Sequence, residues 1–327
     1  MNPTRRNVTK AVATLALGGL SPFASAQEYP SKPIRLVVGY PPGGANDIQA
    51  RQIAPRLAEV LGTPVVVDNK PGANAALGAE FVAKAAPDGY TLLAGGLTPL
   101  VLNLLTYKKL PYDPVKDFIG VSTVASTPIL FAVRPGVAAN SLAELVRLAK
   151  AKPGGLNFAT TGTGGSTRVV FELLNQSAGV DIRYVPYKGA APGITDLLGG
   201  VVDGMAVDFP VLYPFVKEGK LRGLAISSEA RNPLLPELRT AAEQGMPELT
   251  CGNWSSLMVP AKTPRAIVER LHAAMNKVVR MPELRQQMLG IGFVPEASAS
   301  PEAFSAFMQS EIARWGKVIK AAGVEAE

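Results

Sequence analysis

The sequence contains one cysteine and one histidine in 327 residues. Cys251 cannot form an internal disulfide, so the stability of the fold has to come from its core, and the strand-like LTCGNWSSLMVP around it predicts a small buried side chain. His272 falls on a helix-like segment among alternating polar and apolar positions, which is typical of a surface residue. With one side chain of each kind and no D-x-D-x-D-G loop, neither a metal site nor a bound cofactor is expected.

The motifs of the common nucleotide-binding and hydrolytic sites are also missing. TGTGGST has no lysine after its last glycine, as a P-loop requires, and PPGGAND has no third glycine at the spacing of a dinucleotide fingerprint. There is no G-x-S-x-G elbow. Asp203 and Asp208 in VVDGMAVD point to opposite faces of their strand by parity, so they form no ready acid and base pair. The sequence therefore predicts a protein that binds without catalysing.

Charge and hydropathy are moderate. The formal net charge is +7, with 47% hydrophobic and 18% charged residues. Without Arg5, Arg6 and Lys10, which lie in the export segment described next, 30 basic residues remain against 26 acidic ones, or +4. This scattered excess does not indicate nucleic-acid binding, although it would not repel a small anion. After the export segment, no run approaches the ~18 to 20 apolar residues of a membrane span, so a soluble mature protein is expected.

Residues 1–26 are typical of an export signal. TRRNVTK is a charged segment with paired arginines, AVATLALGGL is a short apolar segment, and ASA before Gln27 is a small-residue cleavage site. The paired arginines favour the twin-arginine route, and Val8, where a larger apolar residue is more usual, leaves the general secretory route open. The chain is therefore expected to be exported.

Strand-like and helix-like segments alternate almost from end to end, which predicts an α/β fold with largely parallel sheets. The last third changes to helix-like segments that each begin at a proline, as in PRAIVERLHAAMNKVVR. The length favours two domains.

Two strand-to-helix joints of similar composition stand out. PPGGAND (41–47) follows the strand-like IRLVVGY, and TTGTGGST (160–167) follows the strand-like LNFAT about 120 residues later. Each would leave backbone N–H groups free at the start of a helix, where the helix dipole favours an anion. If the two joints face one another across a cleft, the sequence predicts an anion-binding site between two lobes.

Several side chains near these joints are candidates for ligand contacts. Asp47 is more readily a helix cap than a ligand group. Arg168, in the first turn after TTGTGGST, could hold a carboxylate with two hydrogen bonds or simply be solvated. Thr98 and Asp208 stand at comparable strand ends, where open α/β sheets bind ligands. The candidate binding residues are Tyr40, Pro42, Gly43, Gly44, Ala45, Asp47, Thr98, Thr161, Gly162, Thr163, Gly164, Gly165, Ser166, Arg168 and Asp208.

The sequence resembles the Bug-type receptors, the solute-binding proteins of the tripartite tricarboxylate transporter class. The resemblance runs through nearly all of the mature chain, in an ordered series of segments: YPSKPIRLVVGYPPGGANDIQAR, VVVDNKPGANAALGAE, APDGYTLL, LPYDPVKDF, AKPGGLNFATTGTGG, VPYKGAAPGITDLLGGVVDGM, GKLRGLAISS and VPAKTPRAIVERL. It implies a two-lobed periplasmic binding protein of the type II-like class, which closes about a hinge on a small carboxylate and delivers it to a membrane permease.

The resemblance also implies how the site is divided. The PPGG loop and the loop around Thr98 would supply the contacts of the first lobe, and the loop around Gly162 and Gly164 those of the second, while Asp208 matches a position that can meet the polar end of a ligand. Gly165 stands where a hydroxyl residue is common in the family, and Arg168 where histidine is common. Aspartate, glutamate, citrate, nicotinate and aromatic acids all stay open as ligands.

The sequence thus predicts a monomeric receptor with lobe 1 formed by residues 27–127 and 247–327 and lobe 2 by residues 128–246. The chain would cross between the lobes near Thr127 and near Pro247. Two alternatives stay open: an exported enzyme that acts on a carboxylate in the same cleft, and a sensor that presents its closed form to a signalling partner.

Overall fold

The structure is a computed structural model that describes residues 29–321. The export signal expected in residues 1–26 lies outside the described residues. Within the described range, no helix combines the length and the apolar character that a membrane crossing requires.

The alternation of strands and helices expected from the sequence is confirmed. The strands are β1 (Ile34–Val38), β2 (Val65–Asn69), β3 (Thr91–Gly96), β4 (Phe118–Val133), β5 (Asn157–Thr160), β6 (Arg183–Pro186), β7 (Gly204–Asp208), β8 (Arg222–Ile226), β9 (Gly252–Pro260) and β10 (Val294–Pro295). The α-helices are α1 (Ala45–Leu61), α2 (Ala76–Ala83), α3 (Asn103–Thr106), α4 (Leu142–Ala151), α5 (Ser166–Ala178), α6 (Ala190–Leu198), α7 (Phe209–Lys217), α8 (Arg265–Arg280), α9 (Pro282–Leu289) and α10 (Pro301–Ala321). A π-helix, η1 (Thr98–Leu102), and two 3-10 turns, η2 (Ala242–Gln244) and η3 (Pro247–Leu249), complete the described chain.

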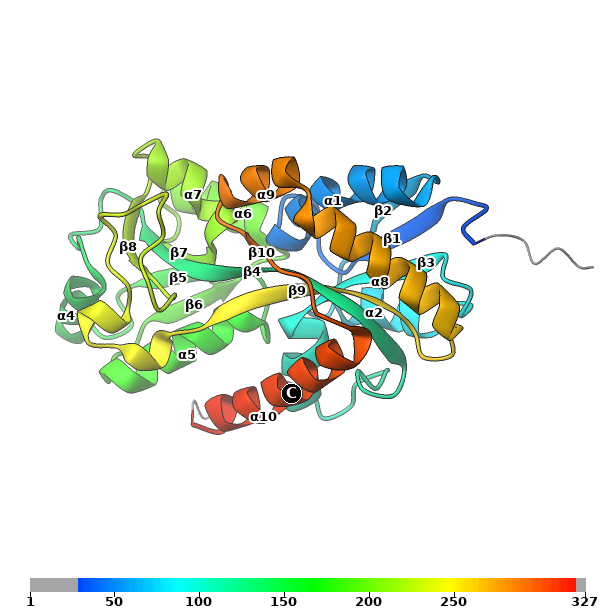
Figure 1. The fold of residues 1–327 in the computed structure, drawn as a ribbon. Helices are drawn as coiled ribbons and strands as arrows, with labels where there is room; N and C mark the ends of the chain where they lie inside the picture. Colours follow the sequence, from blue (N-terminus) through cyan, green and yellow to red (C-terminus); the bar gives the residue numbers. More distant parts are fainter. Residues whose placement is uncertain (1–28, 322–327) are drawn as a thin grey trace, which may run out of the picture.

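The strands form one continuous sheet in the order β2-β1-β3-β9-β4-β7-β5-β6, with β8 and β10 also paired to β4. The outer strands on each side run parallel, as β1 does with β2 and β3, and β5 with β6 and β7. The long strand β4 joins the two sides: it pairs with β9 from Phe118 to Pro128 and with β7 from Ile129 to Val133. The fold is therefore two-lobed and α/β, with β4 and β9 running between the lobes (Figure 1).

The C-terminal helices return to the lobe that contains β1. Helix α8 packs against α1, and α10 lies against β4 and η1. The reason is the apolar stripe of α8, where Val268, Leu271, Met275 and Val278 recur at helical spacing and are all buried. They join β1, β3 and α1 in one hydrophobic cluster.

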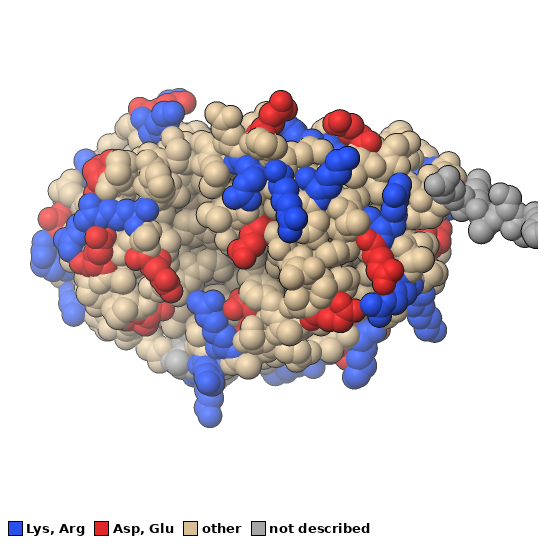
Figure 2. Space-filling view, in the orientation of Figure 1, with Lys and Arg blue, Asp and Glu red and all other residues tan. Residues whose placement is uncertain are grey.

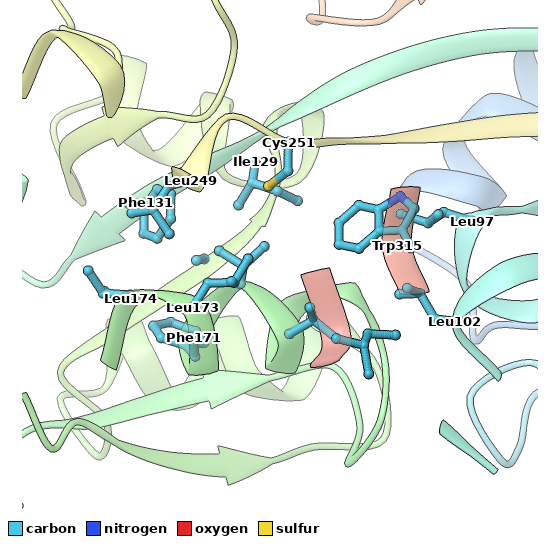
Figure 3. Close-up of a cluster of buried hydrophobic side chains, with 14 of the residues drawn as sticks. Leu97, Leu102, Ile129, Phe131, Phe171, Leu173, Leu174, Leu249, Cys251 and Trp315 are labelled. Atoms are coloured by element: carbon cyan, nitrogen blue, oxygen red, sulfur yellow. The ribbon is translucent and has the colours of Figure 1, made fainter. Parts of the chain in front are cut away.

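A second cluster is shared by the two lobes. It includes Phe131 and Phe171 on one side and Leu97, Leu102 and Trp315 on the other, as the close-up in Figure 3 shows. Cys251 belongs to the same cluster, which confirms the buried position expected for it, and burial raises the pKa of its thiol to about 11. Apolar packing is therefore continuous beside the strands that join the lobes.

Candidate functional site

A cavity of about 60 Å³ lies between the ends of strands from both lobes. Six strand-to-helix joints contribute to its wall: β1 to α1, β2 to α2, β3 to η1, β5 to α5, β6 to α6, and β7 to α7. The residues of these joints that line it are Tyr40, Pro41, Gly44, Ala45, Asn46, Asn74, Leu97, Thr98, Thr161, Gly165, Ser166, Thr167, Gly189, Ala190, Val207 and Asp208. The carboxyl ends of parallel strands are where open α/β sheets bind ligands, and here the two lobes present them to the same space.

Three helices begin at this cavity with glycine as the N-cap residue. Gly44 precedes α1, Gly165 precedes α5 and Gly189 precedes α6, and no side chain caps any of the three in the described structure. The first-turn N–H groups of a helix have no partner within the helix, so they are left for another acceptor. Three helix N-termini also place positive partial charge on one small volume, which favours an anion.

The polar side chains around the cavity are almost all neutral. Among the described lining residues there is no lysine, arginine or histidine. The polar groups are instead amides and hydroxyls, from Asn46, Gln49, Asn74, Asn253, Tyr40, Thr98, Thr127, Thr161, Ser166, Thr167 and Ser255. An anion in this cavity would be held by oriented neutral dipoles rather than by an ion pair.

Asp208 is the one carboxyl group among the described lining residues. It is the N-cap residue of α7, and its Oδ1 accepts a hydrogen bond from the side-chain amide of Asn253. Burial raises the pKa of Asp208 to about 6, although the bond from Asn253 acts in the opposite direction. The carboxyl group therefore titrates close to neutral pH and can accept a hydrogen bond when ionised or donate one when protonated.

The two lobes touch at the edge of the cavity. An added Cβ on Gly189, whose φ is +104°, would lie 3.1 Å from the ring of Pro41, and one on Gly164 would lie 3.0 Å from Nδ2 of Asn74. The amide of Asn74 also donates to the hydroxyl of Tyr107 at 2.9 Å. The structure therefore has its lobes closed around the cavity, with the glycines permitting the close approach.

The loop that carries Asn74 has an unusual backbone. Ala73, Asn74 and Ala75 have φ values of 46°, 51° and 69°, a left-handed conformation that side chains other than glycine rarely adopt. Asn103 stabilises it by donating a hydrogen bond to the carbonyl of Asn74 at 3.0 Å. Strained backbone of this kind occurs preferentially at ligand sites, and here it turns the amide of Asn74 toward the opposite lobe.

Comparison with known proteins agrees with the two-lobed fold. The family model described as "Tripartite tricarboxylate transporter family receptor" matches residues 49–324. The chain belongs to this receptor family. The protein BugT of Bordetella pertussis is 34% identical over 324 residues, which cover 98% of this chain and 99% of that protein. The resemblance to Bug-type receptors noted in the sequence is confirmed.

Two similar proteins of known structure are described with small acids. The R. palustris protein Rpa4515, described with adipate, is 34% identical and superposes with a TM-score of 0.88, covering 92% of this chain and all of that one. MatC from Rhodopseudomonas palustris, described with bound malate, is 32% identical with a TM-score of 0.84, covering 89% of this chain and all of that one. This chain is therefore a solute-binding receptor of the tripartite tricarboxylate transporter family.

The structure brings about half of the predicted site residues of this receptor to the cavity. Those that line it are Tyr40, Gly44, Ala45, Thr98, Thr161, Gly165, Ser166 and Asp208. Burial raises the pKa of Tyr40, so its hydroxyl stays protonated and able to donate a hydrogen bond at neutral pH. The remaining seven do not line the cavity: Pro42, Gly43, Asp47, Gly162, Thr163, Gly164 and Arg168. Among these, Pro42, Gly43 and Thr163 are exposed to solvent.

Asp47 stabilises the PPGG loop and does not line the cavity. Its carboxylate accepts hydrogen bonds from the backbone N–H of Gly43 at 3.0 Å, from Arg51 Nε at 3.0 Å and from Asn69 Nδ2 at 2.9 Å. Burial raises the pKa of Asp47, but the bonds from Arg51, Gly43 and Asn69 outweigh it and hold the pKa below its usual range. Asp47 thus ties the PPGG loop to α1 and β2, although α1 has Gly44 as its N-cap residue.

Arg168 is also absent from the cavity wall. Its Nη1 donates to the carbonyl of Thr163 at 2.7 Å, and its guanidinium lies over the ring of Tyr184. Glu172 is a further neighbour, 3.5 Å from Nε. In this arrangement the guanidinium contacts Thr163, Tyr184 and Glu172, and Arg168 is not among the residues that line the cavity. The bidentate carboxylate contact considered for Arg168 stays a prediction.

Sequence reasoning missed several lining residues. Gln49 lies one turn inside α1, Asn253 and Ser255 come from the joining strand β9, and Gly189 begins α6. The joint that contains Gly189 has the pattern VPYKGAAP, a strand-like segment followed by glycine and a helix-like segment, and this pattern could have marked it. No local pattern marks Asn253, because its place at the cavity depends on the pairing of β9 with β4.

Proposed function

We propose that the mature protein is a periplasmic receptor that captures a small carboxylate between its lobes and delivers it to a membrane permease of the tripartite tricarboxylate class. The observation that carries the proposal is the convergence of three glycine-capped helix N-termini, at Gly44, Gly165 and Gly189, on one cavity. A carboxylate is small and flat enough to accept hydrogen bonds from several of these N–H groups at once.

The absence of a cationic side chain among the described lining residues supports reversible capture rather than tight retention. A carboxylate held by dipoles and amides has no ion pair to break when the lobes open, which suits a receptor that must release its ligand. Receptors that are 34% and 32% identical to this chain are described with adipate and malate, so a dicarboxylate is the first class to consider. A ligand hydroxyl or amine could donate to Asp208 when that group is ionised.

The strand pairing of the sheet supports a division into lobes. We propose that lobe 1 comprises residues 27–127 and 247–327 and lobe 2 residues 128–246, with a hinge at the two crossings. In support, β4 changes its pairing partner between Pro128 and Ile129, and the second crossing falls in the segment Pro247–Gly252 that leads into β9.

The alternatives are an enzyme and a sensor. Asp208, with its raised pKa, is the group an enzyme would use as a base, so turnover has to be measured together with binding. The mature protein is screened by thermal shift against mono-, di- and tricarboxylates, where an acid at about 100 times its Kd should add roughly 2.7 kcal/mol of stability. Acids that bind are then recovered after long incubation and analysed by mass spectrometry.

We expect an acid that binds to be recovered unchanged. A product different from the added acid would overturn the receptor proposal in favour of an enzyme. Capture of permease subunits by the ligand-bound protein supports delivery, whereas ligand-dependent binding to a membrane kinase domain alone would favour the sensor.

A further inference from the structure

Gln49 is a buried residue that lines the cavity. It lies on α1 one turn after Ala45, and both side chains contribute to the wall. The residue is 3% exposed. Side chains of a helix tilt toward its N-terminus, so the amide of Gln49 is directed back to the start of α1, where the free N–H groups are.

The Nε2 donor of Gln49 has no hydrogen-bond partner among the described residues. Four buried side-chain atoms within residues 29–321 share this property: Gln49 Nε2, Asn103 Oδ1, Arg134 Nε and Ser256 Oγ. Of these four residues, Gln49 is the one that lines the cavity. A buried donor without an acceptor destabilises a fold, so its place here points to an acceptor that arrives with the ligand.

We infer that Gln49 is a specificity-determining residue whose Nε2 donates a hydrogen bond to a carboxylate or carbonyl oxygen of the ligand at the α1 side of the cavity. The inference rests on the proposed function and adds to it a side-chain donor beside the backbone donors. A fixed neutral donor favours a ligand oxygen at this position. It disfavours an ammonium or a methyl group, because either would leave Nε2 buried and unpaired. The ligand class is therefore an acid that presents an acceptor oxygen to lobe 1.

The test is calorimetric titration of wild type and of Gln49→Met with L-malate, succinate and adipate. Methionine keeps the length and shape of glutamine and removes only the polar head. We expect Gln49→Met to weaken binding by about 10- to 100-fold, the effect of one lost hydrogen bond to a charged group. The melting temperature of the variant without ligand should equal or exceed that of wild type, because a buried unpaired donor has been removed.

Gln52→Met is the matched control. It makes the same change on the same helix at a half-buried position that does not line the cavity, and it should leave the affinity unchanged. Gln49→Glu, which keeps the shape and replaces the donor with a carboxylate, should weaken binding at pH 8 more than Gln49→Met does. This second variant keeps the test decisive if the methionine variant folds poorly.

The outcomes separate the inference from the proposed function. Binding of one of the acids by wild type with equal affinity for both Gln49 variants would overturn the role of Gln49 and leave the receptor proposal standing. If wild type binds another acid of the thermal-shift screen instead, the same titrations are made with that acid, and binding of no mono-, di- or tricarboxylate by wild type would overturn both.

Discussion

Asn253 holds Asp208 in place across the junction of the two lobes. The amide of Asn253, in β9, donates to Oδ1 of Asp208 and also lies 3.0 Å from Oγ of Ser166, the first residue of α5. Because Asn253 pairs with Thr127 on β4, the strands that join the lobes orient two groups of the second lobe directly. The protonation of Asp208 is therefore linked to the geometry of the cavity.

The raised pKa of Asp208 predicts how stability depends on pH. The pKa is about 6 in the folded protein, against roughly 3.9 for an unfolded aspartate. Between these values the folded state binds the extra proton, so the free energy of unfolding falls as pH rises from about 4 to about 6. The full difference amounts to roughly 3 kcal/mol. Asp208→Asn, which keeps an acceptor for Asn253, should lose this fall and be more stable than wild type at pH 7.

The measurement is chemical denaturation of both proteins without ligand at several values between pH 4 and pH 7. Parallel curves for wild type and Asp208→Asn across this range would contradict the pKa assigned to Asp208.

The bonds of Asp47 predict a structural phenotype. Asp47→Ala removes the acceptor for Gly43, Arg51 and Asn69, and should cost about 2 kcal/mol of stability at pH 7 while also weakening ligand binding through the loosened loop. Because the folded pKa is lowered, the contribution of the ionised group is present above the unfolded pKa and is lost as pH falls through the folded one. Asp47→Asn removes only the charge. The free energies of unfolding of wild type and Asp47→Asn, measured by denaturation, should therefore become equal in strong acid. A constant difference between them down to that pH would show that the charge of Asp47 is not the cause.

Arg168 should affect the fold more than the ligand. Arg168→Ala loses the bond to the carbonyl of Thr163 and the contact with Tyr184, at a cost of about 1 kcal/mol of stability. The Kd of the variant for the acid bound by wild type should change by less than about threefold. This is well below the tenfold change in Kd that a loss of about 1.4 kcal/mol of binding free energy would cause. Arg147→Ala, on the exposed face of α4, is the control. A tenfold or larger loss of affinity for Arg168→Ala alone, with unchanged stability, would return Arg168 to the ligand site.

The sequence predicted the fold and the two main joints well because both depend on local patterns. Alternating strand and helix segments, and glycines at a strand-to-helix joint, leave direct traces in the chain. PPGGAND and TTGTGGST were predicted to meet, and Gly44 and Gly165 do line the same cavity.

The rest of the site depends on contacts that no local pattern records. Arg168 looked well placed after a helix start, but neighbours on its own lobe hold its guanidinium. Gln49 has the sequence pattern of an ordinary helix residue although it is buried in the folded chain, and Asn253 reaches the cavity only through the pairing of β9 with β4. Tertiary packing, rather than residue type, decides these positions.

The central claim is that a small acid binds where the helix starts converge, and Gly44→Val tests it most directly. The backbone of Gly44 has φ −80° and ψ 166°, which valine adopts readily, and an added Cβ meets nothing closer than the carbonyl oxygen of Pro41 at 3.8 Å. The fold should therefore survive while the side chain blocks the approach to the N–H groups of α1. In calorimetric titrations with L-malate, succinate and adipate, we predict that wild type binds at least one acid one-to-one and that Gly44→Val, with an unchanged melting temperature, binds none. Equal affinity of the two proteins for the same acid would contradict the account.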